Sequence, residues 1–370
     1  MRTLLTPLLL AAVASAETPR HDPRFDLELF ARLAAAEGNV ACSPFSVRVA
    51  LALAQGGARG ATAEEMARVL RLGPGGHDEI AELLRRMQGE QVAVANALWL
   101  QAGDPILPAY LDLARTRYGA VPESLDFAGA PDAAAARINR WVAGKTHDRI
   151  RDIVAADQFN PNTSLVLTNA LYFRAPWLHA FSGHGTKPRP FTLASGEAVD
   201  VPTMRQRESL PYFEGEGVQA VELPYAGGRF GMLLVLREGD LDAAGLRAVV
   251  DGLEPAPVDL SLPRFRFESG FRLDAALKAM GMETAFGRDA DFSGVNGRED
   301  LFIAFVNHRA FIAVDEKGTE AAAATAVGLE RKGEREPPRV FRADRPFLFC
   351  IRERETGTIL FLGRVADPRG

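Results

Sequence analysis

Catalytic and metal-binding motifs are missing from this sequence. Its only cysteines are Cys42 and Cys350, and none of its six histidines lies in a His-Glu-x-x-His motif, so the sequence gives no signal for a zinc site. No Gly-x-Ser-x-Gly turn offers a serine nucleophile either. We therefore expect no metal and no cofactor, and we predict that the chain is not an enzyme. A secreted hydrolase stays open as the weakest alternative, because a catalytic triad need not be local in sequence.

Basic stripes and membrane-spanning lengths of apolar sequence are also missing. The net charge is -5, only five of the 43 basic residues are lysines, and no Lys/Arg run is present, so we expect no nucleic-acid partner. The N-terminal apolar stretch Leu4–Val13 is too short to cross a bilayer. With Arg2 before it and Ala14-Ser15-Ala16 after it, the stretch is typical of a secretory signal over residues 1–16. We predict a mature chain that begins at Glu17, has no membrane anchor and is secreted or periplasmic; a partly buried N-terminal helix is the alternative.

Enough apolar residues are present for a large buried core. They make up 47% of the chain, which is too many for a disordered protein, and the abundance of Ala, Gly and Arg is typical of a GC-rich bacterial genome. Both cysteines lie in apolar, strand-like runs. Export permits a disulfide between them, but we favour two buried free thiols.

Helical patterns dominate the first third of the chain and strand patterns the rest. Thr62 and Glu65 form a capping-box pattern at the start of 62–72, Pro131-Asp132 opens a second helix that ends at Gly144, and the apolar stripe 273–280 predicts a third. β-Branched and aromatic runs predict strands at 164–173, 230–236, 258–267, 301–314, 346–352 and 358–365. Since helices and strands do not alternate strictly, the pattern predicts an α+β fold with large antiparallel or mixed sheets in a single domain, residues 17–370.

The segment 315–345 lies between two strand patterns and has little apolar periodicity of its own. In its first half six alternate positions are uncharged, and the charged residues Glu320 and Glu330 fall on the opposite set. The uncharged positions are Thr319, Ala321, Ala323, Thr325, Val327 and Leu329. Period two is typical of a strand with one buried face, so we predict a latent strand. An ordinary surface loop with an Ala-rich helical start is the alternative.

The second half of this segment, 331–338, is charged and ends in two prolines. Arg331, Lys332 and Arg335 are residues of the kind that a trypsin-like specificity pocket recognises. The predicted latent strand is therefore followed directly by residues at which a trypsin-like protease could cleave the chain.

Several blocks of the chain resemble the serpin family, in the order in which that family has them. Val314–Thr325 is similar to the hinge of the serpin reactive loop, and Ala343–Phe349 is similar to the family's C-terminal signature. Further matching blocks are Asn39–Ser46, Thr168–Trp177, Val221–Tyr225 and Asp291–Gly294. The resemblance covers nearly all of the mature chain. It implies three β-sheets, eight or nine helices, an exposed reactive-centre loop at about 316–340 and a metastable native state.

The resemblance implies a suicide substrate for serine proteases. A trypsin-like protease would cleave the loop, and insertion of the loop into the main sheet would trap the acyl-enzyme. The implied reactive bond is Lys332–Gly333, with Arg331 and Arg335 as alternatives. We expect a monomer whose partner is a trypsin-like serine protease. A non-inhibitory binding or chaperone-like member of the same fold is the alternative, which the small, uncharged hinge residues disfavour.

The resemblance also assigns residues to the parts of the sheet that would move. The hinge comprises Glu316, Gly318, Thr319, Glu320, Ala321, Ala322, Ala323, Ala324 and Thr325. The shutter, under the centre of the sheet, comprises Ser43, Ser46, Asn169 and His308. The breach, where insertion begins, comprises Trp177, Arg264 and Glu316, with Arg264 standing where the family commonly has Lys.

Overall fold

The structure is a computed structural model that describes residues 21–35, 37–120, 122–237, 239, 242–320 and 337–370. The predicted signal segment 1–16 lies outside the described residues. So do the hinge residues Ala321, Ala322, Ala323, Ala324 and Thr325 and the predicted cleavage-site residues Arg331, Lys332, Gly333 and Arg335.

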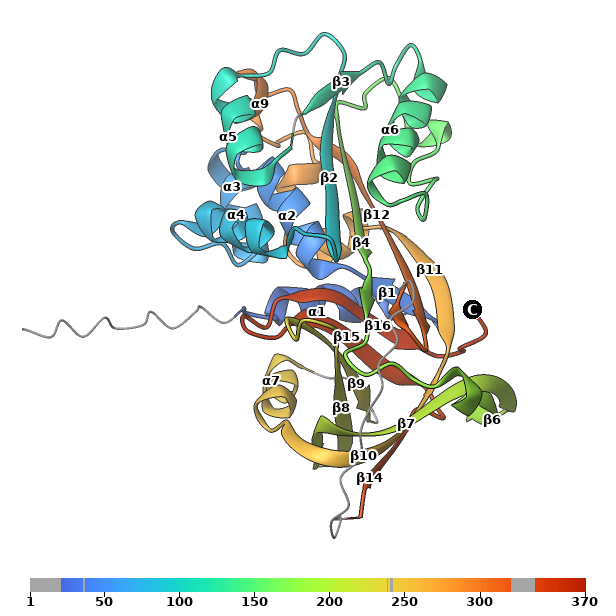
Figure 1. Cartoon of the computed structure of the whole chain (residues 1–370). Helices are drawn as coiled ribbons and strands as arrows, with labels where there is room; N and C mark the ends of the chain where they lie inside the picture. Colours follow the sequence, from blue (N-terminus) through green and yellow to red (C-terminus); the bar gives the residue numbers. More distant parts are fainter. Residues whose placement is uncertain (1–20, 36, 121, 238, 240–241, 321–336) are drawn as a thin grey trace, which may run out of the picture.

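Nine α-helices lie in the described part of the chain, in agreement with the eight or nine expected (Figure 1). They are α1 (Arg24–Leu33), α2 (Pro44–Gln55), α3 (Gly60–Val69), α4 (Gly76–Met87), α5 (Pro108–Tyr118), α6 (Pro131–Lys145), α7 (Ala243–Asp251), α8 (Asp274–Ala279) and α9 (Ser293–Asn296). The three helices predicted from the sequence correspond to α3, α6 and α8. Their apolar stripes therefore mark buried faces, as the periodicity predicted.

The predicted capping box at Thr62 is wrong, because α3 already begins at Gly60 and Thr62 lies inside its first turn. The two polar side chains bind a distant segment instead. The Thr62 hydroxyl accepts a hydrogen bond from the backbone of Asp291, and the Glu65 carboxylate accepts one from the backbone of Thr284. The motif thus joins two parts of the chain that are more than two hundred residues apart.

The main sheet has seven strands among the described residues. Its order is β3 (Glu123–Leu125), β2 (Val92–Gln101), β4 (Leu165–Phe173), β12 (Ile303–Asp315), β13 (Gly318–Thr319) and β5 (Ala175–Pro176), with β11 (Phe265–Arg272) paired to the free side of β12's C-terminal half. β4 and β12 are parallel neighbours from Ile303–Leu165 to Ala310–Leu171. Beyond the end of this ladder, β13 lies between β12 and β5 and pairs with both.

The second sheet has nine strands in the described ranges. Its order is β1 (Val40–Cys42), β16 (Ile359–Val365), β15 (Phe347–Glu353), β9 (Phe230–Leu236), β8 (Val218–Pro224), β7 (Ala198–Gly215), β10 (Glu254–Pro263) and β14 (Arg339–Arg342), with β6 (Lys187–Thr192) paired to β7. The α+β class is confirmed. The strands group into two hydrogen-bonded sheets rather than the three expected, because the 18-residue strand β7 pairs in turn with β6, β10 and β8 and joins them in one ladder.

Helices cover both faces of the main sheet (Figure 1). On one face α2, which is buried at every residue except Gln55, contacts β2 and β4. On the other face α6 places Ile138 and Val142 in one apolar cluster with Trp99 and Phe305. Since both faces are covered, β4 is buried along its whole length, which explains why it is apolar at every position except Thr168 and Asn169.

Candidate functional site

Four predicted residues form a central cluster: Ser43, Ser46, Asn169 and His308. Asn169 on β4 and His308 on β12 are direct partners in the parallel ladder, and Ser43 and Ser46 begin α2 beneath them. His308 Nε2 accepts a hydrogen bond from the Ser43 backbone N–H at 3.0 Å. The other ring nitrogen, Nδ1, therefore carries the proton and donates to Asn169 Oδ1 at 2.6 Å. The Ser46 hydroxyl donates to the same oxygen at 2.8 Å.

The His308 imidazole is neutral in this cluster. The ring is fully buried, and burial lowers its pKa to about 4. A neutral ring is the form that can both accept from Ser43 and donate to Asn169. The four residues therefore form a hydrogen-bonded polar cluster inside an apolar core, at the contact between β4 and β12.

Asn96 also belongs to this network, although it is not among the residues predicted from the sequence. It is the register partner of Asn169 on the other side of β4, and the Asn169 side-chain amide donates to its carbonyl oxygen. The Asn96 amide nitrogen is buried and has no hydrogen-bond partner among the described residues. The one feature of the sequence that could have indicated Asn96 is its place as a polar residue in the middle of an apolar, strand-like run.

The three predicted breach residues lie together at the end of the β4–β12 ladder. The Trp177 indole N–H donates to the carbonyl of Asp315 at 2.9 Å, and its backbone N–H donates to the carbonyl of Lys317 at 2.9 Å. Arg264 donates through Nε to Glu316 at 2.7 Å. Burial raises the pKa of Glu316, but the hydrogen bonds from Arg264 and Thr186 outweigh it and leave the pKa below its usual value. The Glu316 carboxylate is thus ionised and holds the start of the hinge against Arg264.

The first hinge residues form the short strand β13. Thr319 pairs with Val314 of β12 on one side and with Ala175 of β5 on the other, and it is 1% exposed. Its hydroxyl lies 2.7 Å from the hydroxyl of Tyr225, whose ring stacks on Trp177. Gly318 has a φ of +152°, and a Cβ there would lie 2.2 Å from a backbone oxygen of β5, so only glycine fits.

Glu320 is the last described residue before the loop. Its φ of +51° is left-handed, so the chain leaves the extended strand conformation there. Its side chain is 5% exposed and lies 2.9 Å from Arg149 Nε, just after α6. It also accepts a hydrogen bond from Tyr172, whose pKa is raised by burial and by this carboxylate. No local pattern marks Arg149 or Tyr172 as partners, because they lie 171 and 148 residues before Glu320 in the chain.

The next described residue is 337, after which the chain enters β14 of the second sheet, and β14 pairs in parallel with β10. The sixteen residues 321–336, which hold the predicted cleavage-site residues, therefore join the main sheet to the second sheet. None of the described residues forms a group of three or more His, Cys, Asp or Glu side chains that could hold a metal ion. No helix in the described ranges is long and apolar enough to cross a membrane.

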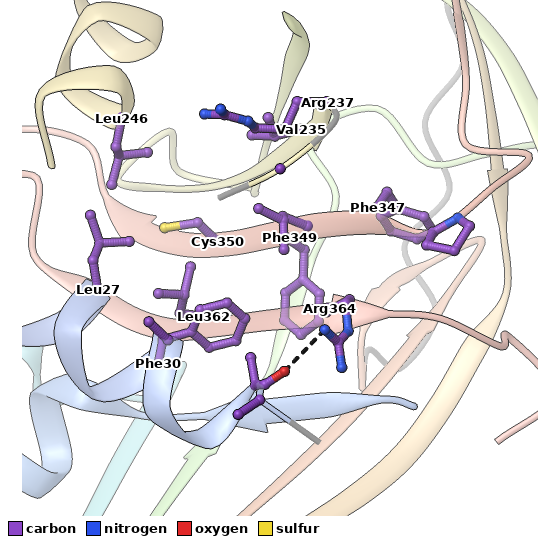
Figure 2. A pocket seen from close by; sticks show the side chains of 16 residues that line it. Leu27, Phe30, Val235, Arg237, Leu246, Phe347, Phe349, Cys350, Leu362 and Arg364 are labelled. Atoms are coloured by element: carbon purple, nitrogen blue, oxygen red, sulfur yellow. Dashed lines mark hydrogen bonds between the residues drawn. The ribbon is translucent and has the colours of Figure 1, made fainter. Parts of the chain in front are cut away.

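A cavity of about 530 Å³ lies away from these clusters (Figure 2). Its walls come from α1, β9, β15 and β16, with Leu27, Phe30, Phe349 and Leu362 among the lining side chains. Cys350 also lines it, while Cys42 is fully buried, and the two thiols are unpaired. The preference for free thiols is therefore confirmed. None of the predicted site residues lines this cavity.

The fold and the hinge together define a class of protein. A sheet with a parallel central pair, a two-residue strand entering at the end of that pair, and a long connection from there to a second sheet are the features of the serpin fold. The chain belongs to this family: residues 21–368 match the family model described as Serpin (serine protease inhibitor). Serpins are protease inhibitors and not enzymes, so the prediction that the chain is not an enzyme is confirmed.

Known relatives span nearly the whole chain. An uncharacterised serpin-like protein of Thermococcus kodakarensis is 42% identical over 363 residues, covering 93% of this chain and 84% of that protein. The leukocyte elastase inhibitor of Sus scrofa is 35% identical over 375 residues, covering 93% of this chain and 98% of the inhibitor. Among solved structures, Serpin48 of the insect Tenebrio molitor matches with a TM-score of 0.82 and 32% identity, covering 94% of this chain and 96% of its own.

Proposed function

We propose that the protein inhibits trypsin-like serine proteases as a suicide substrate, and that insertion of the cleaved loop between β4 and β12 traps the acyl-enzyme. The single observation that carries this proposal is β13. Its two residues already pair with β12 on one side and with β5 on the other. A strand that grew from β13 would only have to continue both registers.

Continuing the two registers matches the alternation in the loop sequence. Thr319 faces the larger apolar core, where Val314 and Tyr225 lie. The uncharged alternate positions from Ala321 to Leu329 would fall on this same face. Thr325 would lie opposite both His308 and Asn169, which now pair with each other. The inserted strand would thus bring a hydroxyl to the central cluster at the point where its hydrogen bonds must be broken.

Insertion requires the parallel β4–β12 ladder and the central cluster to open, which supports the predicted shutter role of Ser43, Ser46, Asn169 and His308. The Glu316–Arg264 pair fixes the start of the hinge, which supports a breach role for these two residues and for Trp177. Because the inserted form gains a full strand of hydrogen bonds, the native form is a kinetic trap rather than the most stable state.

The residues around the proposed reactive bond set the target. Lys332 with Gly333 is the favoured bond, and Arg331 and Arg335 are the alternatives. A basic side chain suits the specificity pocket of trypsin-like enzymes. The basic residues favour trypsin-like targets over an elastase, although one relative is named an elastase inhibitor. We also propose that the inhibitor is monomeric and exported, with Glu17 as its first residue; N-terminal sequencing of the secreted protein tests the export.

Incubation with trypsin tests the proposal. A denaturing gel should show a covalent complex, together with a released C-terminal fragment that begins at Gly333. Lys332→Ala should abolish the complex, whereas the matched variant Arg335→Ala should leave it intact. Trypsin with its active-site serine blocked serves as the control and should give neither product. Clean cleavage without a complex, and without a gain in thermal stability, would support a non-inhibitory binding or chaperone-like member of the fold instead.

A further inference from the structure

Three arginines and one exposed valine form a basic face on the second sheet. The basic face comprises Arg205 and Arg207 on β7 and Val340 and Arg342 on β14. Between them on β10, Asp259 pairs in register with Arg207 and Val340, while Ser261 pairs in register with Arg205 and Arg342. Register partners and residues two apart in a strand share one side of a sheet. These side chains therefore lie on the same surface, next to the strand that follows the reactive loop.

The basic face has a net positive charge and opens to solvent. Arg205 and Arg207 share a single carboxylate, that of Asp259, yet their side chains stay 41% and 67% exposed. Arg342 is exposed and has no ion-pair partner among the described residues. Val340 is 45% exposed and is one of two large apolar side chains that the described part of the chain leaves exposed. Three cations and one anion thus surround an apolar contact, on a protein whose net charge is -5.

The position of the basic face relative to the loop decides which partner it meets. Only six residues, 333–338, separate the proposed scissile bond from β14. Fully extended, six residues span at most about 20 Å. A protease of roughly 220 residues is about 40 Å across. An enzyme bound at Lys332–Gly333 must therefore overhang β14 and its neighbours.

From this geometry we infer that the basic face is a second contact site for the target protease, and that it selects trypsin-like enzymes with an acidic surface beside their active-site cleft. The inference rests on the proposed function. Charges at the rim of an interface act mainly on the association rate and on its salt dependence. The loop thus binds the specificity pocket of the protease, and the basic face contacts the acidic surface beside the active-site cleft.

The test compares an anionic with a cationic trypsin, using Arg342→Glu and a matched control. The control is Arg115→Glu, which changes the net charge equally at an exposed site on α5, at the opposite end of the molecule from β14 (Figure 1). At about 0.01 M salt, a two-unit charge change some 10 Å from one acidic group alters a rate by about threefold. Arg342→Glu should slow association with anionic trypsin by about that factor or more and should not slow association with cationic trypsin. The difference between the two trypsins in their response to Arg342→Glu should vanish at about 0.5 M salt.

Each outcome decides between the possibilities. Absence of a covalent complex with either trypsin would refute the proposed function itself. Normal complexes whose rates respond to Arg342→Glu no more than to Arg115→Glu would refute the second contact site alone. Retention of the parent on heparin that Arg342→Glu abolishes, with unchanged trypsin rates, would also overturn it and assign the face to a polyanion. Arg342→Gln, which removes one charge instead of reversing it, should give a smaller slowing and guards against misfolding of the reversal variant.

Discussion

Two substitutions at Thr319 should separate the stability of the native form from the ability to inhibit a protease. Its side chain is 1% exposed between β12 and β5, and its hydroxyl contacts the buried hydroxyl of Tyr225. An arginine cannot be accommodated there without an unpaired buried charge. We expect Thr319→Arg to expel the hinge from the sheet and to turn the inhibitor into a substrate. Thr319→Val keeps the shape and removes only the hydrogen bond.

The structure sets the size of both effects. Thr319→Val leaves the Tyr225 hydroxyl without its partner, which lowers the stability of the native form by about 1–3 kcal/mol. The same bond would be present before and after insertion, so its loss cancels, and the valine variant should inhibit normally. Thr319→Arg already expels the hinge in the native form, so insertion must bring the arginine back between β12 and β5, and the cost of an unsatisfied buried group then opposes insertion. About 1–3 kcal/mol then slows insertion by roughly 5- to 150-fold relative to hydrolysis of the acyl-enzyme.

Two measurements distinguish these variants. The stoichiometry of inhibition of trypsin should stay near the parent's value for Thr319→Val and should rise steeply for Thr319→Arg, with cleaved inhibitor replacing the complex on a denaturing gel. Denaturant unfolding should show the lower stability of the valine variant, and Tyr225→Phe combined with Thr319→Val should recover part of it. An arginine variant that traps trypsin as well as its parent would refute the insertion mechanism, because a buried charge would then have had no effect.

Three further predictions concern the core. Burial lowers the pKa of His308 from 6.5 to about 4, so the unfolded chain binds the proton first, and the stability present above pH 6.5 should fall by about 3 kcal/mol between pH 6.5 and 4; denaturant midpoints at pH 7 and 4.5 measure this, and His308→Gln should flatten the dependence. Glu316→Lys places two cations side by side at Arg264 and should lower the melting temperature and give polymer on a native gel, while unchanged values for both would show that the pair has no role. Burial raises the pKa of Cys42 and of Cys350, so a thiol reagent should label neither in the native protein and both in denaturant; labelling of the folded protein at neutral pH would contradict this.

Local patterns in the sequence predict much of the fold. Apolar periodicity locates α3, α6 and α8 and the strands β4, β9, β12, β15 and β16, because each element buries one face or stripe regardless of its partners. It misses β2 and β7, and the strand predicted at 258–267 joins the end of β10 to the start of β11, which lie in different sheets. The number of sheets does not follow from such patterns. It depends on where β7 meets β6, β8 and β10, and pairing between strands is set by contacts over long sequence distances. The capping-box pattern at Thr62 fails for the same reason, since a distant backbone segment takes up its side chains.

The residues of the candidate site likewise divide into those that the sequence predicts and those that only the structure shows. The hinge residues are recognisable because their alternation is a property of one strand, and the resemblance assigns the central cluster residue by residue. Asn96 and Arg149 could not be found, because their roles come from strand register and from the position of the segment after α6. A buried asparagine in a strand has no local pattern that separates it from an exposed one. Only the register with Asn169 shows that it completes a polar network.

That network has a consequence for how the sheet opens. Asn169 and His308 are buried and bond each other and the start of α2, and the Asn169 amide has one further bond, to Asn96 on β2. Partial separation of β4 and β12 without entry of water or of a new strand would leave these groups unpaired, at about 1–3 kcal/mol for each group. We infer that the cluster disfavours half-open states, so the sheet is either closed or filled. A strand that brings Thr325 to this register offers the missing hydrogen-bonding group, which links the opening of the sheet to the arrival of the loop.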